Sequence, residues 1–175
     1  SRSSAASDVY KRQRWIGAAD SPARLNGEIC QASACTELRN AILYATSPDI
    51  FEGAELAAFD ALTGAARMCR YGGDCYSYGL LASGHVDLVV EAGLQPYDYL
   101  ALMPVIEGAG GVITDWSGQP LSLESQGRVV AAATPQLHRQ AMRVLRQTPK
   151  HRKNSSSTPP PAAASDRYSD VHSGV

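Results

Sequence analysis

The 175-residue sequence predicts an α/β fold in which helices cover a largely buried sheet. Two observations lead to this prediction. First, short apolar runs alternate with helical patterns over residues 68–145. Second, the run VDLVVE, which ends at Glu91, is too apolar to leave one face of its strand in water. The composition is 44% hydrophobic, which is enough for one core of ordinary size.

The folded domain is expected to cover residues 14–148. Residues 1–13 contain neither an apolar run nor a periodic pattern, and we expect a leader that is non-native or disordered. Residues 149–175 are rich in Ser, Pro and Ala and cannot bury one face, so we expect a disordered tail.

Short apolar runs predict the strands, which we place at residues 15–18, 28–32, 41–46, 68–71, 86–91, 111–115 and 128–133. Asn26-Gly27 is expected to form a turn between the first two, because both residues tolerate positive φ. Ser47-Pro48-Asp49 closes the third strand and can cap the helix that follows.

Helical spacing predicts helices at residues 52–67, 74–83, 97–109 and from Pro135 onward. The buried stripes expected on the first and last are Ala54, Ala57, Ala58, Leu62 and Ala65, and Leu137, Ala141, Val144 and Leu145. Pro104 removes one backbone donor inside the third, so that helix is expected to be kinked or to start later.

Charge and cysteine usage exclude several classes of function. A net charge of −1 gives no basic surface for nucleic acid, and no run of 18 apolar residues predicts a membrane span. The four cysteines lack zinc-site spacing and are expected to be reduced thiols. We therefore expect a cytoplasmic protein, and a targeting segment ahead of residue 1 stays an open alternative.

Acidic residues and glycines gather where strands end and helices begin. Gly72-Gly73 precedes a helix that starts near Asp74, and backbone N–H groups at a helix start suit an anion or a hydroxyl-rich ligand. Asp74 either caps that helix or offers its carboxylate to a cation. Glu91 closes a strand, where open α/β sheets place their ligands. Asp98 is either an N-terminal cap or a metal ligand.

Four tyrosines could also line a cleft, although packing explains them equally well: Tyr76, Tyr78, Tyr97 and Tyr99. A site with two metal ions needs more carboxylates than this chain brings together. The residues alone therefore predict part of a phosphate-and-metal site.

Three segments carry a resemblance to a known family: RYGGDCYSYGLLASGHVDLVVEAG, PYDY and EGAGGVITDWSG. From about Trp15 to Leu145 the chain resembles the inositol monophosphatase superfamily, and more closely its histidinol-phosphatase branch. The resemblance implies the C-terminal portion of a layered αβαβα sandwich that hydrolyses small phosphomonoesters with Mg²⁺. It implies that Asp98 is a metal ligand and that the substrate contacts are Arg70, Gly72, Gly73, Asp74 and Glu91.

The resemblance also shows what the chain lacks. The family's upstream metal-binding Glu and its DPxDGT-type motif do not occur here. We therefore expect the C-terminal half of a longer enzyme, with no catalytic residue of its own and no turnover as a separate chain.

The expected substrate is L-histidinol phosphate, an intermediate of histidine biosynthesis, because Asp74 and Glu91 suit its cationic groups. Inositol phosphate or a related sugar phosphate is the alternative, and a non-catalytic binding module is the alternative from another class. A homodimer is left open.

Overall fold

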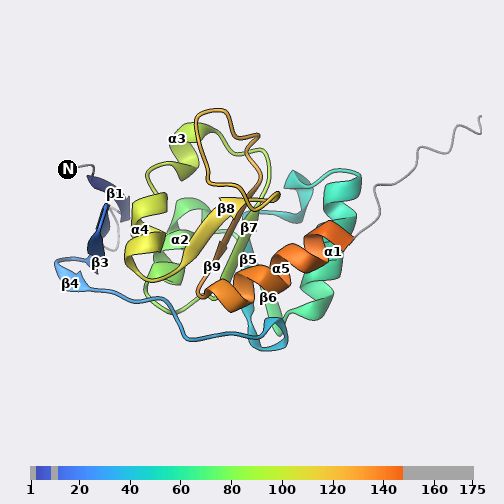
Figure 1. The fold of residues 1–175 in the computed structure, drawn as a ribbon, viewed down its shortest axis with the longest axis horizontal. Coiled ribbons are helices and arrows are strands. Elements are labelled where there is room, and N and C mark those ends of the chain that lie inside the picture. Colours follow the sequence, from blue (N-terminus) through green and yellow to red (C-terminus); the bar gives the residue numbers. More distant parts are fainter. Residues whose placement is uncertain (1–2, 9–11, 148–175) are drawn as a thin grey trace, which may run out of the picture.

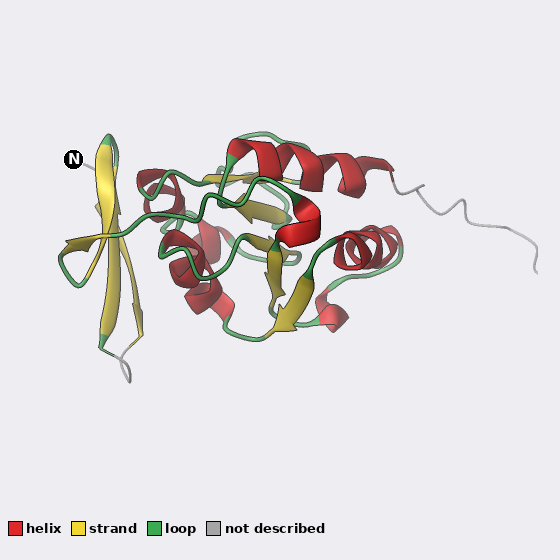
Figure 2. Cartoon of the chain, turned by 90° about the horizontal axis from the view of Figure 1, so that it is seen from below, coloured by secondary structure: helices red, strands yellow, loops and turns green. Residues whose placement is uncertain are grey.

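The chain folds into four stacked layers, which run sheet, helix, sheet, helix (Figures 1 and 2). This computed structural model describes residues 3–8 and 12–147. The order matches four consecutive layers of an αβαβα sandwich.

The first sheet is antiparallel throughout. In spatial order its strands are β1 (Ser3–Asp8), β2 (Gln13–Ala18), β3 (Ser21–Leu25) and β4 (Glu28–Ile29). It lies at one end of the molecule (Figure 2).

The second sheet is mixed. In spatial order its strands are β6 (Met68–Tyr71), β5 (Ile42–Ala45), β7 (Leu88–Glu91), β9 (Val129–Ala132) and β8 (Val112–Asp115). β5 runs parallel to both β6 and β7, whereas β9 is antiparallel to β7 and β8. Because β5, β6 and β7 run parallel, their carboxyl ends meet at the same edge of the sheet.

Five α-helices and two short 3₁₀ turns complete the described part of the chain. The helices are α1 (Ala54–Ala65), α2 (Asp74–Ala82), α3 (Pro96–Tyr99), α4 (Met103–Gly108) and α5 (Pro135–Gln147). The 3₁₀ turns are η1 (Leu38–Asn40) and η2 (Pro48–Ile50). Within these residues, no helix has both the length and the apolar character that a membrane crossing requires.

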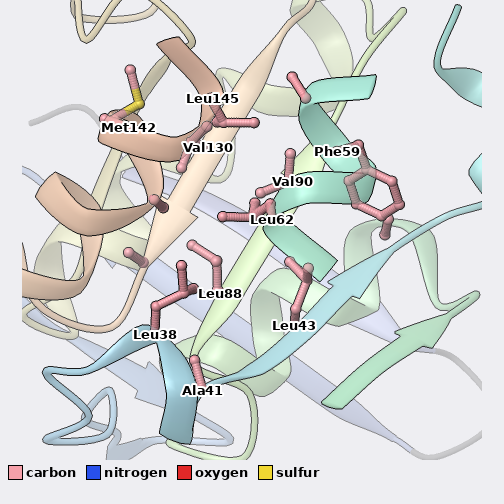
Figure 3. Close-up of a cluster of buried hydrophobic side chains, with 14 of the residues drawn as sticks. Leu38, Ala41, Leu43, Phe59, Leu62, Leu88, Val90, Val130, Met142 and Leu145 are labelled. Carbon is pink, nitrogen blue, oxygen red and sulfur yellow. The ribbon is translucent and has the colours of Figure 1, made fainter. Parts of the chain in front are cut away.

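One hydrophobic core joins the second sheet to α1 and α5 (Figure 3). Leu43, Leu88 and Val90 point from the sheet toward these helices. Phe59 and Leu62 of α1 are fully buried against them. Burying a side chain of this size stabilises a fold by about 1.5–3 kcal/mol, so this core anchors the sheet that carries the site.

A second core lies between the two sheets and contains the inner faces of α2 and α4. Trp15 of β2 is 1% exposed and packs directly on Gly79 of α2, where a Cβ atom would come within 2.8 Å of the indole ring. A Cβ atom on Gly17 would lie 2.3 Å from the carbonyl carbon of Pro104. Small residues therefore let the first sheet approach both helices.

The predicted helix over residues 97–109 is wrong as a single element. The segment forms two short helices, α3 and α4, and Pro104 lies in the first turn of α4. A proline is tolerated there because the first N–H groups of a helix have no intrahelical acceptor.

The N-terminal predictions also need correction. Ser3–Asp8 pairs with β2 as a strand, so the expectation of an unstructured leader does not hold for these residues. β3 was not predicted, and Asn26-Gly27 forms its turn between β3 and β4. Residues 1–2 and 9–11 of the expected leader, and the expected tail over residues 149–175, lie outside the described residues.

Two buried stripes were predicted only in part. On α1, Ala58 and Leu62 are buried as expected, but Ala57 and Ala65 are exposed and Phe59 takes the core position. On α5, His138 and Met142 are buried in addition to the expected residues, and Val144 is half-buried. Neighbouring elements, and not helical spacing alone, decide which residues lie inward.

Candidate active site

The candidate site residues gather at the carboxyl edge of the parallel strands. Thr46 follows β5, Gly72 follows β6 and Glu91 ends β7. Open α/β sheets bind ligands at this edge, so the placement agrees with the expectation for Glu91 and for the Gly72-Gly73 turn.

The turn from β6 into α2 has three consecutive residues with positive φ: Gly72 (91°), Gly73 (99°) and Asp74 (41°). The Gly72 N–H donates to the carbonyl oxygens of Ala45 (3.1 Å) and Thr46 (3.0 Å), which ties the turn to β5. Gly73, not Asp74, is the N-cap residue of α2, so the capping interpretation of Asp74 is wrong. A positive φ is uncommon for a residue with a side chain, so Asp74 is held in a costly conformation.

Glu91 is a buried acid, only 1% exposed. Its Oε1 accepts hydrogen bonds from the Thr46 backbone N–H and from the Thr46 hydroxyl, both at 2.9 Å. Its Oε2 is buried and accepts no hydrogen bond from any described residue. Such an atom destabilises a fold by about 1–3 kcal/mol unless a ligand or water satisfies it.

Burial also changes the acidity of Glu91. It raises the pKa of this carboxyl group from 4.5 to about 7. The hydrogen bonds from Thr46 lower the pKa, and the charge of Asp74 raises it again. A cation placed at Oε2 would favour the ionised form.

Tyr78 lies on α2, one turn after Asp74. The residue is 2% exposed, and its hydroxyl oxygen finds no hydrogen-bond partner among the described residues. Burial raises the pKa of the Tyr78 hydroxyl well above 10.0, and the charges of Glu91 and Asp98 raise it further. Both carboxylates therefore lie within electrostatic reach of this hydroxyl.

Asp98 is the third residue of α3 and is partly buried. Gln95, not Asp98, is the N-cap residue of α3, so the prediction of Asp98 as the N-terminal cap is wrong. Asp98 instead completes a capping box, in which its Oδ2 accepts a hydrogen bond from the Gln95 backbone N–H at 2.8 Å. No bond to the other oxygen occurs within residues 12–147. One free carboxylate oxygen is a suitable but partial contribution to a magnesium site.

The described residues do not make a complete metal site. Among them, no group of three or more His, Cys, Asp or Glu side chains could hold a metal ion. Magnesium is commonly held by one or two carboxylates together with water and substrate phosphate. The predicted role of Asp98 as one such ligand stays a prediction.

Arg70 lies on the edge strand β6, two residues before Gly72. It is exposed and sits beside Tyr44 in the β5–β6 register. Its predicted contact with substrate stays a prediction. Three surface hollows of about 360, 400 and 420 Å³ are lined by other residues and do not include the site.

Comparison with known proteins identifies the fold and the family. The sequence model described as the inositol monophosphatase family matches residues 4–150. The chain belongs to the inositol monophosphatase family. The predicted resemblance and the predicted fold class are thereby confirmed.

Two curated members of the family illustrate the similarity. Bifunctional phosphatase IMPL2, chloroplastic, of Arabidopsis thaliana is 45% identical over 141 residues, which cover 77% of this chain and 41% of that protein. The histidinol-phosphatase of Chlorobaculum parvum is 29% identical over 125 residues, covering 71% of this chain and 46% of that protein. The chain thus spans less than half of the length of these relatives.

Solved inositol monophosphatase structures share the fold. An enzyme from Zymomonas mobilis superposes with a TM-score of 0.79 at 42% identity, over 81% of this chain and 56% of that one. An inositol monophosphatase from Anabaena superposes with a TM-score of 0.73 at 27% identity, over 84% of this chain and 59% of that one. These likenesses establish the family and the fold of this chain.

Sequence reasoning missed one residue of the site, Thr46. It donates two hydrogen bonds to a residue 45 positions away, and no local pattern reveals such a contact. Its position directly after a parallel strand was a usable signal, because the same rule singled out Glu91.

Proposed function

We propose that the intact protein hydrolyses L-histidinol phosphate to histidinol, with Mg²⁺ as the metal. The observation that supports this choice is the buried Oε2 of Glu91, an acceptor that no described residue satisfies. Two further carboxylates, those of Asp74 and Asp98, lie within electrostatic reach of the same region.

The charge of this cluster favours a cationic substrate. In the part of the chain that the structure describes, none of these three acids forms an ion pair; the ion pairs there are Arg39–Glu37 and Arg128–Glu55. Histidinol phosphate carries an ammonium group and an imidazole ring away from its phosphate, whereas inositol phosphate carries neutral hydroxyl groups. A hydrogen bond from a cation to a carboxylate is about twice as strong as a neutral one.

Each residue then has a distinct task. Glu91 accepts a hydrogen bond from the cationic part of the substrate through Oε2, and Asp74 adds negative charge beside it. The Gly72-Gly73 turn and Arg70 contact the rest of the substrate. Asp98 would contribute one carboxylate to the metal, which when bound stabilises charge on the phosphoryl group and activates a water. The remaining metal ligands would come from parts of the relatives' length that this chain does not span.

One relative supports the same substrate by its name, the histidinol-phosphatase of Chlorobaculum parvum. The name of IMPL2, a bifunctional phosphatase, supports the activity without specifying a substrate. The rival substrate, inositol phosphate, is supported by the names of other relatives. The inositol monophosphatase from Zymomonas mobilis is 42% identical, and inositol monophosphatase 2 from Homo sapiens is 44% identical over 57 residues.

The test is a comparison of kcat/KM for histidinol phosphate and inositol 1-phosphate, measured on the protein extended to the length of its relatives. We expect histidinol phosphate to be the better substrate, and Glu91→Gln to reduce this preference. Glu124→Gln, which removes an exposed carboxylate elsewhere, serves as the matched control. Equal or better turnover of inositol phosphate would reject the proposed substrate. Binding of either compound without any hydrolysis would favour a non-catalytic binding module.

A further inference from the structure

The hydroxyl group of Tyr78 has no role in the site described so far. It is almost completely buried, it is polar, and no described residue accepts or donates a hydrogen bond to it. Buried hydroxyl groups in folded proteins almost always have a partner. An unpaired hydroxyl beside a candidate site therefore indicates a group that arrives from outside the chain.

The position of Tyr78 connects it to the carboxylates. Asp74 and Tyr78 are four residues apart on α2, so both side chains lie on one face of the helix. Glu91 faces the same space from β7, because Val89, two residues earlier, packs in the core that contains Tyr78.

The two unpaired atoms complement one another. Oε2 of Glu91 can only accept when the carboxyl group is ionised, whereas a tyrosine hydroxyl can both donate and accept. No hydrogen bond joins them in the structure, although the charge of Glu91 acts on Tyr78. One N–H-bearing group between them could donate to both oxygens, and the hydroxyl hydrogen would remain free for a neighbouring carboxylate.

We propose that Tyr78 is a specificity-determining residue, whose hydroxyl oxygen accepts a hydrogen bond from the same cationic nitrogen group that Glu91 holds. This inference rests on the proposed function and extends it to a residue that neither the family resemblance nor the comparisons assign. It predicts that Tyr78 distinguishes amino-alcohol phosphates from neutral polyol phosphates, and that it has no part in phosphoryl transfer itself.

The test measures the binding of histidinol, which carries the cationic groups and lacks the phosphate. Isothermal titration calorimetry compares the wild-type protein, at the length of its relatives, with Tyr78→Phe. We expect Tyr78→Phe to bind histidinol about tenfold more weakly, the effect of losing one hydrogen bond to a charged group. The ratio of kcat/KM for histidinol phosphate to that for inositol 1-phosphate should fall.

Tyr76→Phe is the matched control. Tyr76 lies on the same helix as Tyr78, and its hydroxyl already donates a hydrogen bond to the side chain of Gln13 at 2.9 Å. This variant should therefore keep its affinity for histidinol. Thermal unfolding separates a binding role from a structural one. Removing an unpaired hydroxyl should leave the melting temperature of Tyr78→Phe equal or higher, whereas Tyr76→Phe should lower it.

Three results would overturn the inference. Histidinol affinity could be the same in Tyr78→Phe and wild type, which leaves the proposed substrate intact. The melting temperature of Tyr78→Phe could fall, which would mean that the hydroxyl has a structural partner. Tyr78→Phe could also weaken turnover of both phosphate esters equally, which would mean that Tyr78 does not discriminate. By contrast, a wild-type protein that hydrolyses inositol phosphate and not histidinol phosphate refutes the proposed function directly.

Discussion

The buried carboxyl group of Glu91 links pH to stability in a way that can be measured. Replacing it by Glu91→Gln keeps the shape and the acceptor for Thr46, and removes the ionisation. The folded protein raises the pKa of this group from 4.5 to about 7 because it is buried. The fold therefore prefers the protonated form, which Gln resembles.

The magnitude follows from the pKa change. A pKa difference corresponds to about 1.4 kcal/mol for each pH unit, so the change from 4.5 to about 7 is equivalent to about 3 kcal/mol. Because the folded state raises the pKa of Glu91, the stability that this group contributes is fully present below about pH 4.5. It is lost as the pH rises through about 7, because the unfolded chain ionises first and the folded chain must then bury a charge.

The assay is urea unfolding of the chain and of Glu91→Gln at a series of pH values from about 4 to about 8. All other titrating groups are shared, so they cancel in the difference between the two free energies of unfolding. We expect this difference to shift in favour of Glu91→Gln by about 3 kcal/mol across the range. Glu124→Gln, the control, should shift far less, because its carboxylate is exposed.

Parallel curves for wild type and Glu91→Gln would refute the reasoning. They would mean that the Glu91 carboxyl group ionises as it does in water, so that it is solvated or already paired with a cation of the chain. The argument for a cationic substrate group would then lose its main support.

Three further substitutions test other parts of the site and the fold. Asp98→Asn, in the protein at the length of its relatives, should lower kcat by about 100-fold or more. Its unfolding free energy should fall by less than about 1 kcal/mol, since Asn can still accept from Gln95; near-normal activity would remove Asp98 from the metal site. Asp74→Gly should be about 1 kcal/mol more stable than Asp74→Ala in urea unfolding, because φ is 41°; the opposite order would show that the turn is unstrained. Gly17→Ala should destabilise the fold by about 1–3 kcal/mol, because its Cβ atom would meet Pro104, and Gly64→Ala, with open space around it, should not. Equal melting temperatures for these two variants would contradict the close packing of β2 on α4.

The segment from β6 to β7 could be predicted well because its signals are local. The pair Gly72-Gly73 supplies two residues that adopt positive φ without strain, so a sharp turn is expected from sequence alone. VDLVVE is apolar on both faces because the strand is covered by helices on both sides, and the structure shows all four residues of β7 buried.

Other features could not be predicted because they depend on distant parts of the chain. The inward position of Phe59 on α1 is decided by packing against Phe51, whose ring centroid lies 4.0 Å away. The bond between Thr46 and Glu91 joins two strands, and the unpaired state of Oε2 becomes visible only when all neighbours are in place. Likewise, sequence left Tyr78 open between packing and function, and only the structure reveals that its buried hydroxyl has no hydrogen-bond partner among the described residues.

The capping-box bond of Asp98 and its proposed metal role do not compete, since they use different oxygens. The bond from Gln95 occupies Oδ2 and fixes the orientation of the side chain at the start of α3. The charge of Asp98, like that of Glu91, raises the pKa of the Tyr78 hydroxyl. A ligand oxygen that a backbone bond already orients loses less freedom when a cation binds, because its rotamer is set in advance. The capping-box bond is therefore compatible with the proposed metal role, which near-normal activity of Asp98→Asn would contradict.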